Sequence, residues 1–288
     1  MKLAVLADIH ANFSALQTVV DHLDCWKPDA VVVAGDTVNR GPRPLECLQF
    51  VQRRQQTEGW QIVRGNHEDY VLNYNQPNAV TSGPAFEIFR CAYWTYQQLN
   101  GNISALEAMP FQANLSAPNG SEARIVHASM KNNRNGIFPK TSDDSLRQKI
   151  RSDTQPAPSL FCVGHTHIPL IRHIDNTLVV NVGAVGLPFD ADPRAAYAQI
   201  TWHNGGWSAE IIRLDYDRQQ TEKDYHDHGF LEGGGPLVQL ILDELHCAES
   251  NLYQWTAQYH DAVIAGDLSL QDSVTNYLAN KPKNIWYK

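Results

Sequence analysis

LAVLADIH (residues 3–10) and AVVVAGD (residues 30–36) are two short apolar runs, and each of them leads into an aspartate. Between them, apolar residues three and four positions apart predict a helix over residues 12–23. Continuous apolar runs are typical of strands that are buried on both faces, and helices between such strands indicate parallel βαβ units. Residues 3–36 therefore predict the start of a parallel sheet whose strands end on chemically active side chains.

The rest of the chain continues this pattern and then changes it. Residues 44–54 predict a helix, residues 60–64 a strand, and residues 84–108 a mainly helical, aromatic-rich segment. Short strands separated by turn signals at Asn176 and at residues 203–206 follow. We expect these strands at residues 125–126, 160–163, 170–174, 178–182, 195–202 and 207–214. A parallel half followed by an antiparallel half predicts an α/β (α+β) fold with two packed sheets and helices outside.

The chain of 288 residues divides by pattern into two parts. Residues 1–214 are the predicted catalytic domain, and residues 215–288 are a predicted helical C-terminal extension. Apolar stripes in the extension, which include Leu240 and Ile241, fit helices that cover the second sheet and equally fit a homo-oligomer contact. Residues 233–235 are three glycines, and we expect a flexible linker there.

Charge and composition argue against several classes of protein. With 23 Lys and Arg against 31 Asp and Glu, the formal net charge is −8, so we expect no extended nucleic-acid surface. No apolar run approaches the ~20 residues of a membrane span, and the N-terminal run lacks a signal-peptide pattern. Five cysteines without a CxxC pair favour free thiols in a reducing compartment. We therefore expect a cytoplasmic protein without a membrane partner.

Candidate metal ligands follow five of the predicted strands. The carboxyl ends of the strands in an α/β sheet form its ligand-binding crevice, so we expect these side chains to converge. Carboxylates, imidazoles and one amide oxygen form a donor set that suits divalent first-row metals. The side chains are Asp8 and His10, Asp36, Asn66 with His67, His127, and His165 with His167.

Asp36 is alone at its strand end, which makes it the natural candidate to bridge two ions. Two metals roughly 3.5–4 Å apart would clamp a phosphoryl group and lower the pKa of a bound water, which produces a nucleophile at neutral pH. Glycines before Asp36, Asn66 and His165 permit tight turns that aim these side chains at a shared site. The pattern therefore predicts a dinuclear centre for phosphoester chemistry.

The ordered motifs of this chain resemble those of the calcineurin-like metallophosphoesterase superfamily. They are Asp8-x-His10, Gly35-Asp36, Gly65-Asn66-His67-Glu68, His127 and Gly164-His165-Thr166-His167. The resemblance covers residues 1–214, and residues 181–188 are similar to a prokaryotic branch of small phosphoesterases. It implies a four-layer αββα sandwich of two mixed β-sheets flanked by helices. It also implies two divalent metal ions, for which manganese, iron, zinc, nickel and cobalt are all candidates.

The resemblance also implies a role for each ligand position. Asp8, His10, Asp36 and His167 would hold one metal, and Asp36, Asn66, His127 and His165 would hold the other. His67 would lie outside the metals and donate a proton to the leaving oxygen or stabilise the transition state. The implied reaction is in-line attack on phosphorus by a metal-bound hydroxide, with a phosphodiester or small nucleotide as substrate. The alternatives are a phosphomonoesterase or protein phosphatase, and a non-catalytic scaffold of the same fold.

Asn39 and Arg40 follow the second strand in a run that is similar to the protein serine/threonine phosphatase motif. In that motif an aspartate at the position of Asn39 orients the catalytic histidine, so this chain lacks the orienting charge. Arg40 is a candidate catalytic residue because a guanidinium group can hold phosphate oxygens as a bidentate donor. A surface arginine on the same loop is the alternative.

Several other features of the sequence have simpler interpretations. We expect Arg64 to be structural and Arg194 to form a loop ion pair with Asp192. His226 and His228 fit a solvated helix face better than a second metal cluster. The aromatic residues from Phe86 to Tyr96 have helical spacing, which favours core or lid packing over nucleobase stacking.

Overall fold

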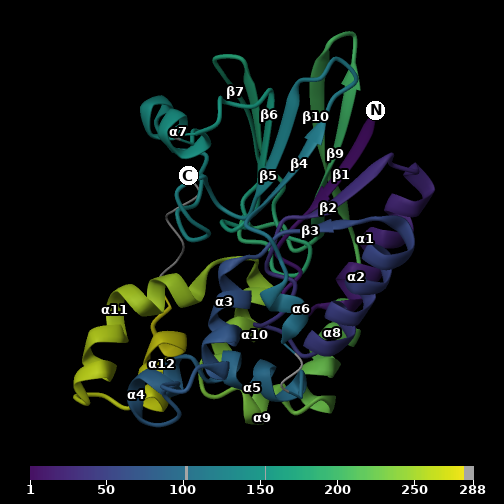
Figure 1. Ribbon diagram of the computed structural model, residues 1–288. Coiled ribbons are helices and arrows are strands. Elements are labelled where there is room, and N and C mark those ends of the chain that lie inside the picture. The colour runs from purple at the N-terminus through teal and green to yellow at the C-terminus, as the bar shows by residue number, and fades with distance from the viewer. Residues whose placement is uncertain (101–102, 153, 282–288) are drawn as a thin grey trace.

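Two five-stranded sheets form the centre of the computed structural model, which describes residues 1–100, 103–152 and 154–281 (Figure 1). The first sheet contains, in spatial order, β10 (Gly206–Leu214), β9 (Ala195–His203), β1 (Lys2–Leu6), β2 (Ala30–Val33) and β3 (Gln61–Ile62). The second contains β4 (Gln112–Ser116), β5 (Glu122–Val126), β6 (Leu160–Val163), β8 (Thr177–Asn181) and β7 (Leu170–Ile174).

Each sheet mixes parallel and antiparallel pairs. β1, β2 and β3 are parallel, and β9 returns to pair antiparallel with β1. In the second sheet β5, β6 and β8 are parallel, whereas β4 and β7 are antiparallel edge strands. The earlier, parallel part of the chain and the later, antiparallel part therefore do not form one sheet each. The late strands β9 and β10 instead complete the first sheet.

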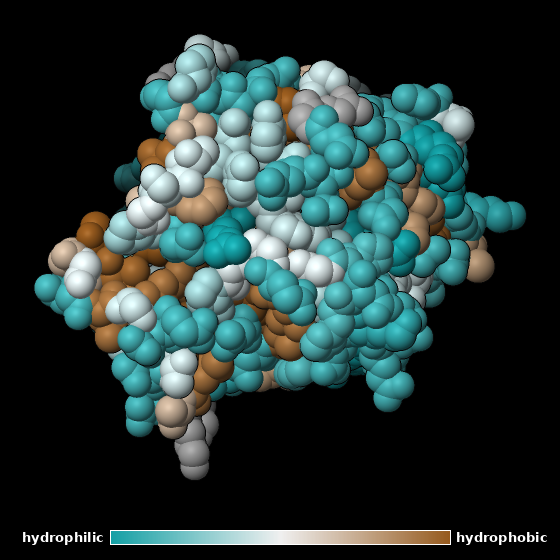
Figure 2. Space-filling model, turned by 90° about the horizontal axis from the view of Figure 1, so that it is seen from below, coloured by the Kyte–Doolittle hydropathy of each residue, from teal (hydrophilic) through white to brown (hydrophobic). Residues whose placement is uncertain are grey.

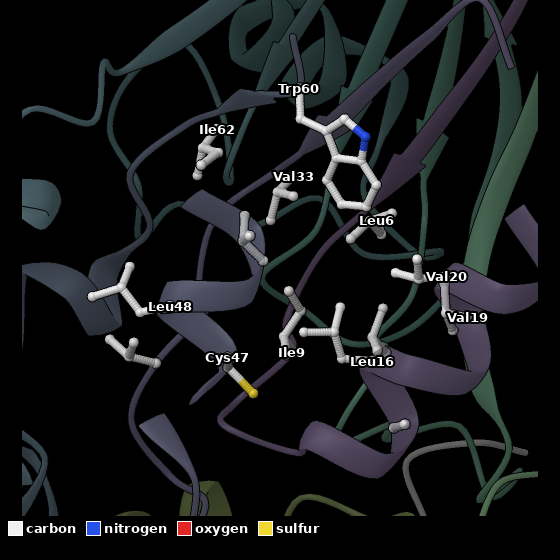
Figure 3. Close-up of a cluster of buried hydrophobic side chains, with 14 of the residues drawn as sticks. Leu6, Ile9, Leu16, Val19, Val20, Val33, Cys47, Leu48, Trp60 and Ile62 are labelled. Carbon is white, nitrogen blue, oxygen red and sulfur yellow. The ribbon is translucent and has the colours of Figure 1, made fainter. Parts of the chain in front are cut away.

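Helices cover the outer faces of both sheets, so the four-layer αββα sandwich is confirmed. α1 (Phe13–Trp26) and α2 (Pro44–Glu58) pack on the first sheet through a core that includes Leu6, Leu16 and Leu48 (Figure 3). α7 (Asp143–Ile150) covers the second sheet through Leu146 and Ile150. The inner faces meet in a third apolar core, in which side chains of β1 and β2 pack with those of β5, β6 and β8.

β1 shows why its apolar run is continuous. Leu3 and Val5 point into the core between the sheets, while Ala4 and Leu6 point toward α1 and α2. Since successive side chains of a strand face opposite sides, a strand with helices on one face and a sheet on the other needs apolar residues at every position.

A further group of helices lies beneath the strand ends in Figure 1. It contains α3 (Asn66–Leu72), the short 3₁₀ helix η1 (Asn73–Asn75), α4 (Gly83–Ile88), α5 (Arg90–Gln98), α6 (Ser104–Glu107), α8 (Arg218–Asp227), α9 (Phe230–Gly233), α10 (Val238–Cys247), α11 (Asn251–Ala265) and α12 (Leu270–Ala279). α5 and α8–α12 share a core that includes Trp94, Phe230, Ile241 and Trp255, whereas Val71 of α3 and Leu106 of α6 pack in the core on the first sheet.

The C-terminal helices pack on the strand-end edge rather than on the second sheet. Their core takes in Leu187 and Phe189 from the loop before β9, and α8 contacts α1. The stripe of Leu240 and Ile241 is thus buried within the chain itself. The domain boundary at residue 214 stays a prediction, and residues 282–288 of the predicted extension lie outside the described residues.

Three local expectations differ from the structure. β4 was not expected, because only one of its residues, Ala113, is buried and the strand lies at a sheet edge. The strand expected at residues 60–64 shortens to β3 because the chain turns there toward Asn66. Residues 233–235 are not a free linker: a Cβ on Gly233 would lie 2.4 Å from the Trp94 ring, so this backbone is closely packed.

The face of the molecule at its helical end is largely polar (Figure 2). Seen from below, hydrophilic residues cover most of the helical end of the molecule, and apolar side chains gather mainly toward the side of α11, α12 and α4 (Figure 2). Among the described residues, no helix combines the length and the apolar character that crossing a bilayer requires.

Candidate metal centre

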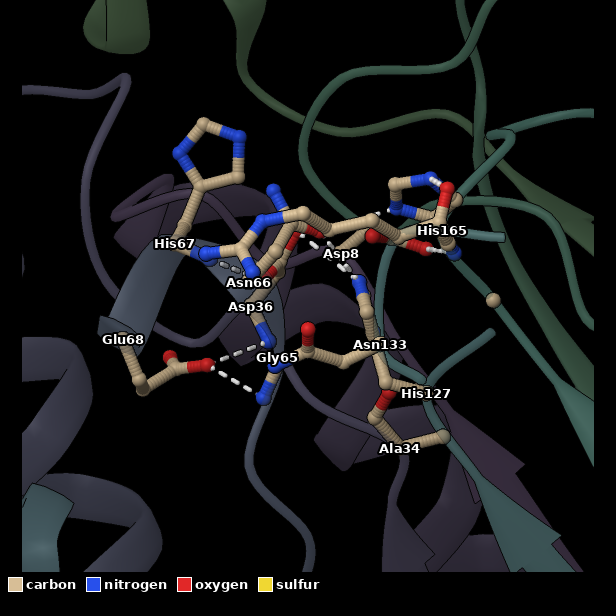
Figure 4. A network of polar contacts seen from close by, with 12 residues as sticks. Asp8, Ala34, Asp36, Gly65, Asn66, His67, Glu68, His127, Asn133 and His165 are labelled. Atoms are coloured by element: carbon tan, nitrogen blue, oxygen red, sulfur yellow. Dashed lines mark hydrogen bonds and ion pairs between the residues drawn. The ribbon is translucent and has the colours of Figure 1, made fainter. Parts of the chain in front are cut away.

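Five strand-end loops bring the predicted ligands to one place between the two sheets (Figure 4). One group consists of Asp8, His10, Asp36 and His167, and a second of Asp36, His127 and His165; the ligand atoms of each group lie within 4.8 Å of one another. Asp36 belongs to both groups. All of these side chains are buried except that of His165, which is partly exposed.

Asp36 contacts both groups through the same oxygen. Its Oδ2 lies 3.2 Å from His127 Nε2 and 3.8 Å from His10 Nε2. Its Oδ1 accepts a hydrogen bond of 2.9 Å from the backbone N–H of His67, which fixes the carboxylate. The oxygen left free by that bond is therefore the one that two ions could share.

Asn66 completes the second group. Its Oδ1 lies 3.0 Å from His127 Nε2 and 2.8 Å from His165 Nδ1. Asn66 is the first residue of α3, directly after the glycine that ends the β3 loop. The amide oxygen thus lies on the same side of the site as both imidazoles.

Each of the four histidines uses one ring nitrogen on a backbone carbonyl. His10 and His127 contact the carbonyl oxygens of Asn39 and Ala34 through Nδ1, at 3.2 and 2.8 Å. His167 and His165 contact those of Leu187 and Arg134 through Nδ1 and Nε2, respectively. A carbonyl only accepts, so the proton of a neutral imidazole is used there and the lone pair of the other nitrogen faces the site.

This arrangement fits divalent cations. His10 Nε2 and His167 Nε2 lie 3.1 Å apart, and Asp8 Oδ1 lies 3.3 Å from His167 Nε2. Asp8 Oδ1 is fully buried and has no hydrogen-bond partner among the described residues. Acceptors that face one another in a buried volume are unfavourable without a positive charge between them, and this nitrogen and oxygen donor set suits first-row metals.

The pKa values of the ligand histidines shift in opposite directions. Burial and the neighbouring histidines lower the pKa of His10 well below its ordinary value, and burial lowers that of His165 to about 3. Burial also opposes protonation of His127, but the charge of Asp36 and its hydrogen bond outweigh burial and raise the pKa of His127 to about 10. Without metal, His127 is therefore the one of these three that holds an additional proton.

Glu68 stabilises the loops that follow β2 and β3, a role that we did not predict from its motif. Its carboxylate accepts hydrogen bonds from the backbone N–H groups of Asp36, Thr37 and Gly65 at 2.9, 2.7 and 2.8 Å. Burial and the charge of Asp36 raise the pKa of Glu68 to about 7. Its position three residues after the glycine of Gly-Asn-His-Glu was the available signal, since an acid at the third helical position reaches back to its own helix start.

The ligand loops use left-handed backbone. Asp8, His10, Asp36, His165 and His167 have φ between 48° and 68°, which non-glycine residues seldom adopt. Gly65 is required for a different reason: a Cβ there would lie 2.1 Å from Asp36 Oδ1. Such strain persists only where the surroundings over-determine it, and here it places the ligands.

His67 lies beside the ligand groups without joining either of them. Its ring packs edge-on against His10 at 4.8 Å, and its Nδ1 lies 2.8 Å from Asn39 Nδ2. Asn39 Oδ1 is already occupied by the backbone N–H of Arg40 at 2.8 Å, so the amide group offers N–H to His67. Arg40 is partly exposed, and after burial its charge is among the causes that lower the pKa of His67.

The C-terminal helices support this edge of the site. Thr221 Oγ1 of α8 donates to Asn12 Oδ1 at 3.0 Å, two residues after His10. Phe189, which belongs to the helical core, stacks on the His167 ring at 4.3 Å. Neither contact could be read from residue types, because both join segments far apart in the chain.

The remaining sequence expectations have clear outcomes. Arg194 pairs with Asp192 at 2.7 Å, as predicted. His226 and His228 are exposed and belong to neither ligand group found among the described residues, which confirms a solvated face. Arg64 has its Nε 3.6 Å from Asp69 and also lines a cavity beside the site.

A two-sheet sandwich with a buried Asp/His/Asn cluster at its strand ends is the architecture of a metal-dependent phosphoesterase. The sequence profile of the calcineurin-like phosphoesterase superfamily domain matches residues 1–205. The chain therefore belongs to this superfamily and is a metal-dependent phosphoester hydrolase.

Known proteins agree with this assignment. The crystal structure of a metallophosphoesterase from Sphaerobacter thermophilus superposes with a TM-score of 0.64 at 25% identity, over 86% of this chain and all of that one (100%). An uncharacterized protein of Methanocaldococcus jannaschii is 26% identical over 235 residues, 75% of this chain and 88% of that protein. A symmetrical bis(5′-nucleosyl)-tetraphosphatase of Psychromonas ingrahamii is 34% identical over 73 residues, only 25% of this chain and 26% of the enzyme.

Gly65→Ala tests the close approach of the loops. We expect the added methyl group to push Asp36 out of place, to abolish metal uptake and to lower the free energy of unfolding by about 1–3 kcal/mol. Gly206→Ala is the matched control, because a Cβ there meets nothing within 4 Å. Metal content and thermal unfolding of both variants check this, and normal metal content in Gly65→Ala would contradict it.

The pKa of His127 predicts the pH dependence of metal binding. Below pH 10 a metal must displace the proton on His127, whereas His10 and His165 are already neutral near pH 7, since their pKa values are lowered. The apparent affinity for Mn²⁺ should therefore rise about tenfold per pH unit between pH 6.5 and 8.5. Calorimetry in two buffers of different ionisation enthalpy should show about one proton released; none released would refute the prediction.

Proposed function

We propose that this protein hydrolyses a phosphodiester or small nucleotide with two divalent metal ions. The observation that carries the proposal is the pair of ligand groups that share Asp36. When bound, two such ions polarise a phosphoryl oxygen and lower the pKa of a coordinated water. Asp8, His10 and His167 would hold one ion together with Asp36, and Asn66, His127 and His165 would hold the other with it.

His67 is proposed to stabilise the charge that develops on the leaving oxygen in the transition state. Asn39 Nδ2 faces His67 Nδ1 at 2.8 Å, so Nδ1 accepts a hydrogen bond and the ring proton lies on Nε2. A neutral imidazole in this tautomer can donate a hydrogen bond from Nε2 to the charge that develops on the leaving oxygen, without an orienting carboxylate. The buried position of His67 keeps it from bulk water, and burial together with the nearby Arg40 favours the neutral ring.

Arg40 is the proposed phosphate clamp. It follows Asn39 on the same left-handed turn, and the Tyr225 hydroxyl donates to its backbone carbonyl oxygen at 3.5 Å. Among the described residues, Arg40 makes hydrogen bonds only through its backbone N–H and carbonyl oxygen and forms no ion pair, so the N–H groups of its guanidinium are available to a substrate oxygen.

Two considerations favour a phosphodiester or nucleotide over the alternatives. Asn39 gives His67 a neutral partner, unlike the aspartate of the similar protein phosphatase motif, which argues against a phosphoprotein substrate. The partial likeness to bis(5′-nucleosyl)-tetraphosphatases also supports a nucleotide. A non-catalytic scaffold is disfavoured because every ligand position carries a competent side chain.

The five unpaired cysteines support a cytoplasmic location.

A direct assay tests the proposal. Metal-stripped protein resupplied with Mn²⁺ should hydrolyse a bis-aryl phosphodiester faster than the matching monoester. Asp36→Ala should lower kcat by about a thousandfold or more, because both ions lose a shared ligand. The exposed Asp261→Ala is the matched control and should retain full activity. Two bound metals without turnover of either ester would count against the proposed hydrolase.

His67→Ala separates catalysis from metal binding. We expect kcat to fall about 10²- to 10³-fold, the usual effect of removing one positioned donor to the developing charge, while both metals remain bound. The exposed His173→Ala should change neither quantity. Metal content and steady-state kinetics check this; loss of metal from His67→Ala would instead make His67 a ligand or a structural residue.

A further inference from the structure

A cavity of about 470 Å³ lies beside the metal centre and has no role in the proposal above. Its lining includes Arg64, Asp69, Asn73, Gln76, Glu107 and Arg134. It is bounded by the loop around Arg134 on one side and by α3 and η1 on the other. Two arginines in one cavity next to a phosphoesterase site are a feature that a small phosphodiester would not need.

The cavity shares its walls with the ligand groups. The backbone carbonyl oxygen of Arg134 lies 3.0 Å from His165 Nε2, while the side chain of Arg134 lines the cavity. Asp69 lies one helical turn after Asn66 on α3, and Asn133 Nδ2 donates to Asp69 Oδ2 at 2.6 Å. A substrate whose reacting phosphoryl group contacts the ligands can therefore extend into this cavity.

Both guanidinium groups retain free donors. Arg64 Nε lies 3.6 Å from Asp69 Oδ1, and Arg134 Nη2 lies 3.7 Å from Asp69 Oδ2, so each arginine uses one nitrogen in a long ion pair. Their side chains are 34% and 51% exposed. A guanidinium group has five N–H donors in a fixed fork, which suits bidentate binding of phosphate oxygens.

The acidic residues that line the cavity do not prevent the two arginines from binding an anion. Asp69 is already bound by Asn133 and holds the two arginines on the same side of α3. Glu107 is exposed, where solvent screens its charge. The arginines thus remain the groups that an anion would contact in the cavity.

Two aromatic rings lie near His67 and the cavity-lining Arg134. Tyr70 packs edge-on against His67 at 5.1 Å, and the Arg134 guanidinium group lies 5.3 Å from the centre of the Tyr70 ring. Phe89 lies 5.3 Å from Tyr70 and is 44% exposed. An exposed aromatic ring such as that of Phe89 offers a flat surface on which a nucleobase stacks.

We propose that the Arg64–Arg134 cavity binds the non-reacting phosphates of a nucleoside polyphosphate and that Phe89 stacks on its base. The inference rests on the proposed function and specifies its substrate class. It also revises the expected role of Arg64 as purely structural. The packing role expected for the aromatic residues from Phe86 to Tyr96 holds for Tyr93, whose ring packs on that of Tyr74 at 5.2 Å, and for the buried Trp94, and differs at Phe89.

Kinetics with two substrates test the proposal on the Mn²⁺-loaded full chain. Arg64→Ala and Arg134→Ala should each raise KM for adenosine 5′-tetraphosphate by about tenfold, the loss of one charge-assisted contact. Hydrolysis of the bis-aryl phosphodiester should stay within about twofold, because that ester does not reach the cavity and Arg134→Ala keeps its backbone carbonyl. The exposed Arg53→Ala is the matched control. Equal losses on both substrates, or no change with the tetraphosphate, would overturn the subsite.

A binding measurement keeps this test independent of turnover. The methylene-bridged analogue of ATP and inorganic tripolyphosphate should both bind about tenfold more weakly to Arg64→Ala and Arg134→Ala. Phe89→Ala should weaken only the nucleotide, by roughly fivefold or more, since tripolyphosphate has no base to stack. Unchanged binding to all variants overturns the subsite. If wild-type protein binds the analogue through these residues but hydrolyses no ester, the proposed function fails and the subsite stands.

Discussion

Buried acceptor atoms that face one another are the constraint on which the rest of this structure depends. Asp8 Oδ1, Asp36 Oδ2 and the inward ring nitrogens of the histidines share a volume in which every available ring proton is used on a backbone carbonyl. Such a group of lone pairs requires positive charge, either a proton on His127 or a divalent ion. The site therefore favours metal binding for two reasons: its residue types are metal ligands, and the hydrogen bonds of the surrounding backbone turn their lone pairs toward one another.

Holding these groups together requires backbone that the chain would otherwise avoid. Ligand positions such as Asp36 and His167 are left-handed, and Gly65 approaches Asp36 more closely than any side chain would allow. Glu68 offsets this strain by binding three backbone N–H groups of two loops. The cores on both sides of the first sheet then fix the strand ends from which the loops start.

The helical half of the chain changes what the centre can act on. α8 supports the turn after His10 through Thr221, and Phe189 covers the outer face of His167. α3 carries both Asn66, a ligand candidate, and Asp69, which pairs with the two arginines of the neighbouring cavity. α3 thus carries residues of both the candidate metal centre and the proposed polyphosphate subsite. One helix therefore positions groups for the reaction and groups for substrate specificity.

The sequence by itself determined the parallel strands and the candidate ligands that converge at their ends, because apolar runs and strand-end residues such as Asp8 and His165 reflect local constraints. The two mixed sheets were expected only from the resemblance to a known superfamily, and the fold confirms them. It did not place β9 beside β1, join Thr221 to Asn12 or bring Arg64 near Arg134. Those features join segments far apart in the chain, and partner choice there depends on shape and on which hydrogen-bonding groups remain free. Only the packed tertiary structure decides which surfaces are complementary in shape and which hydrogen-bonding groups remain free.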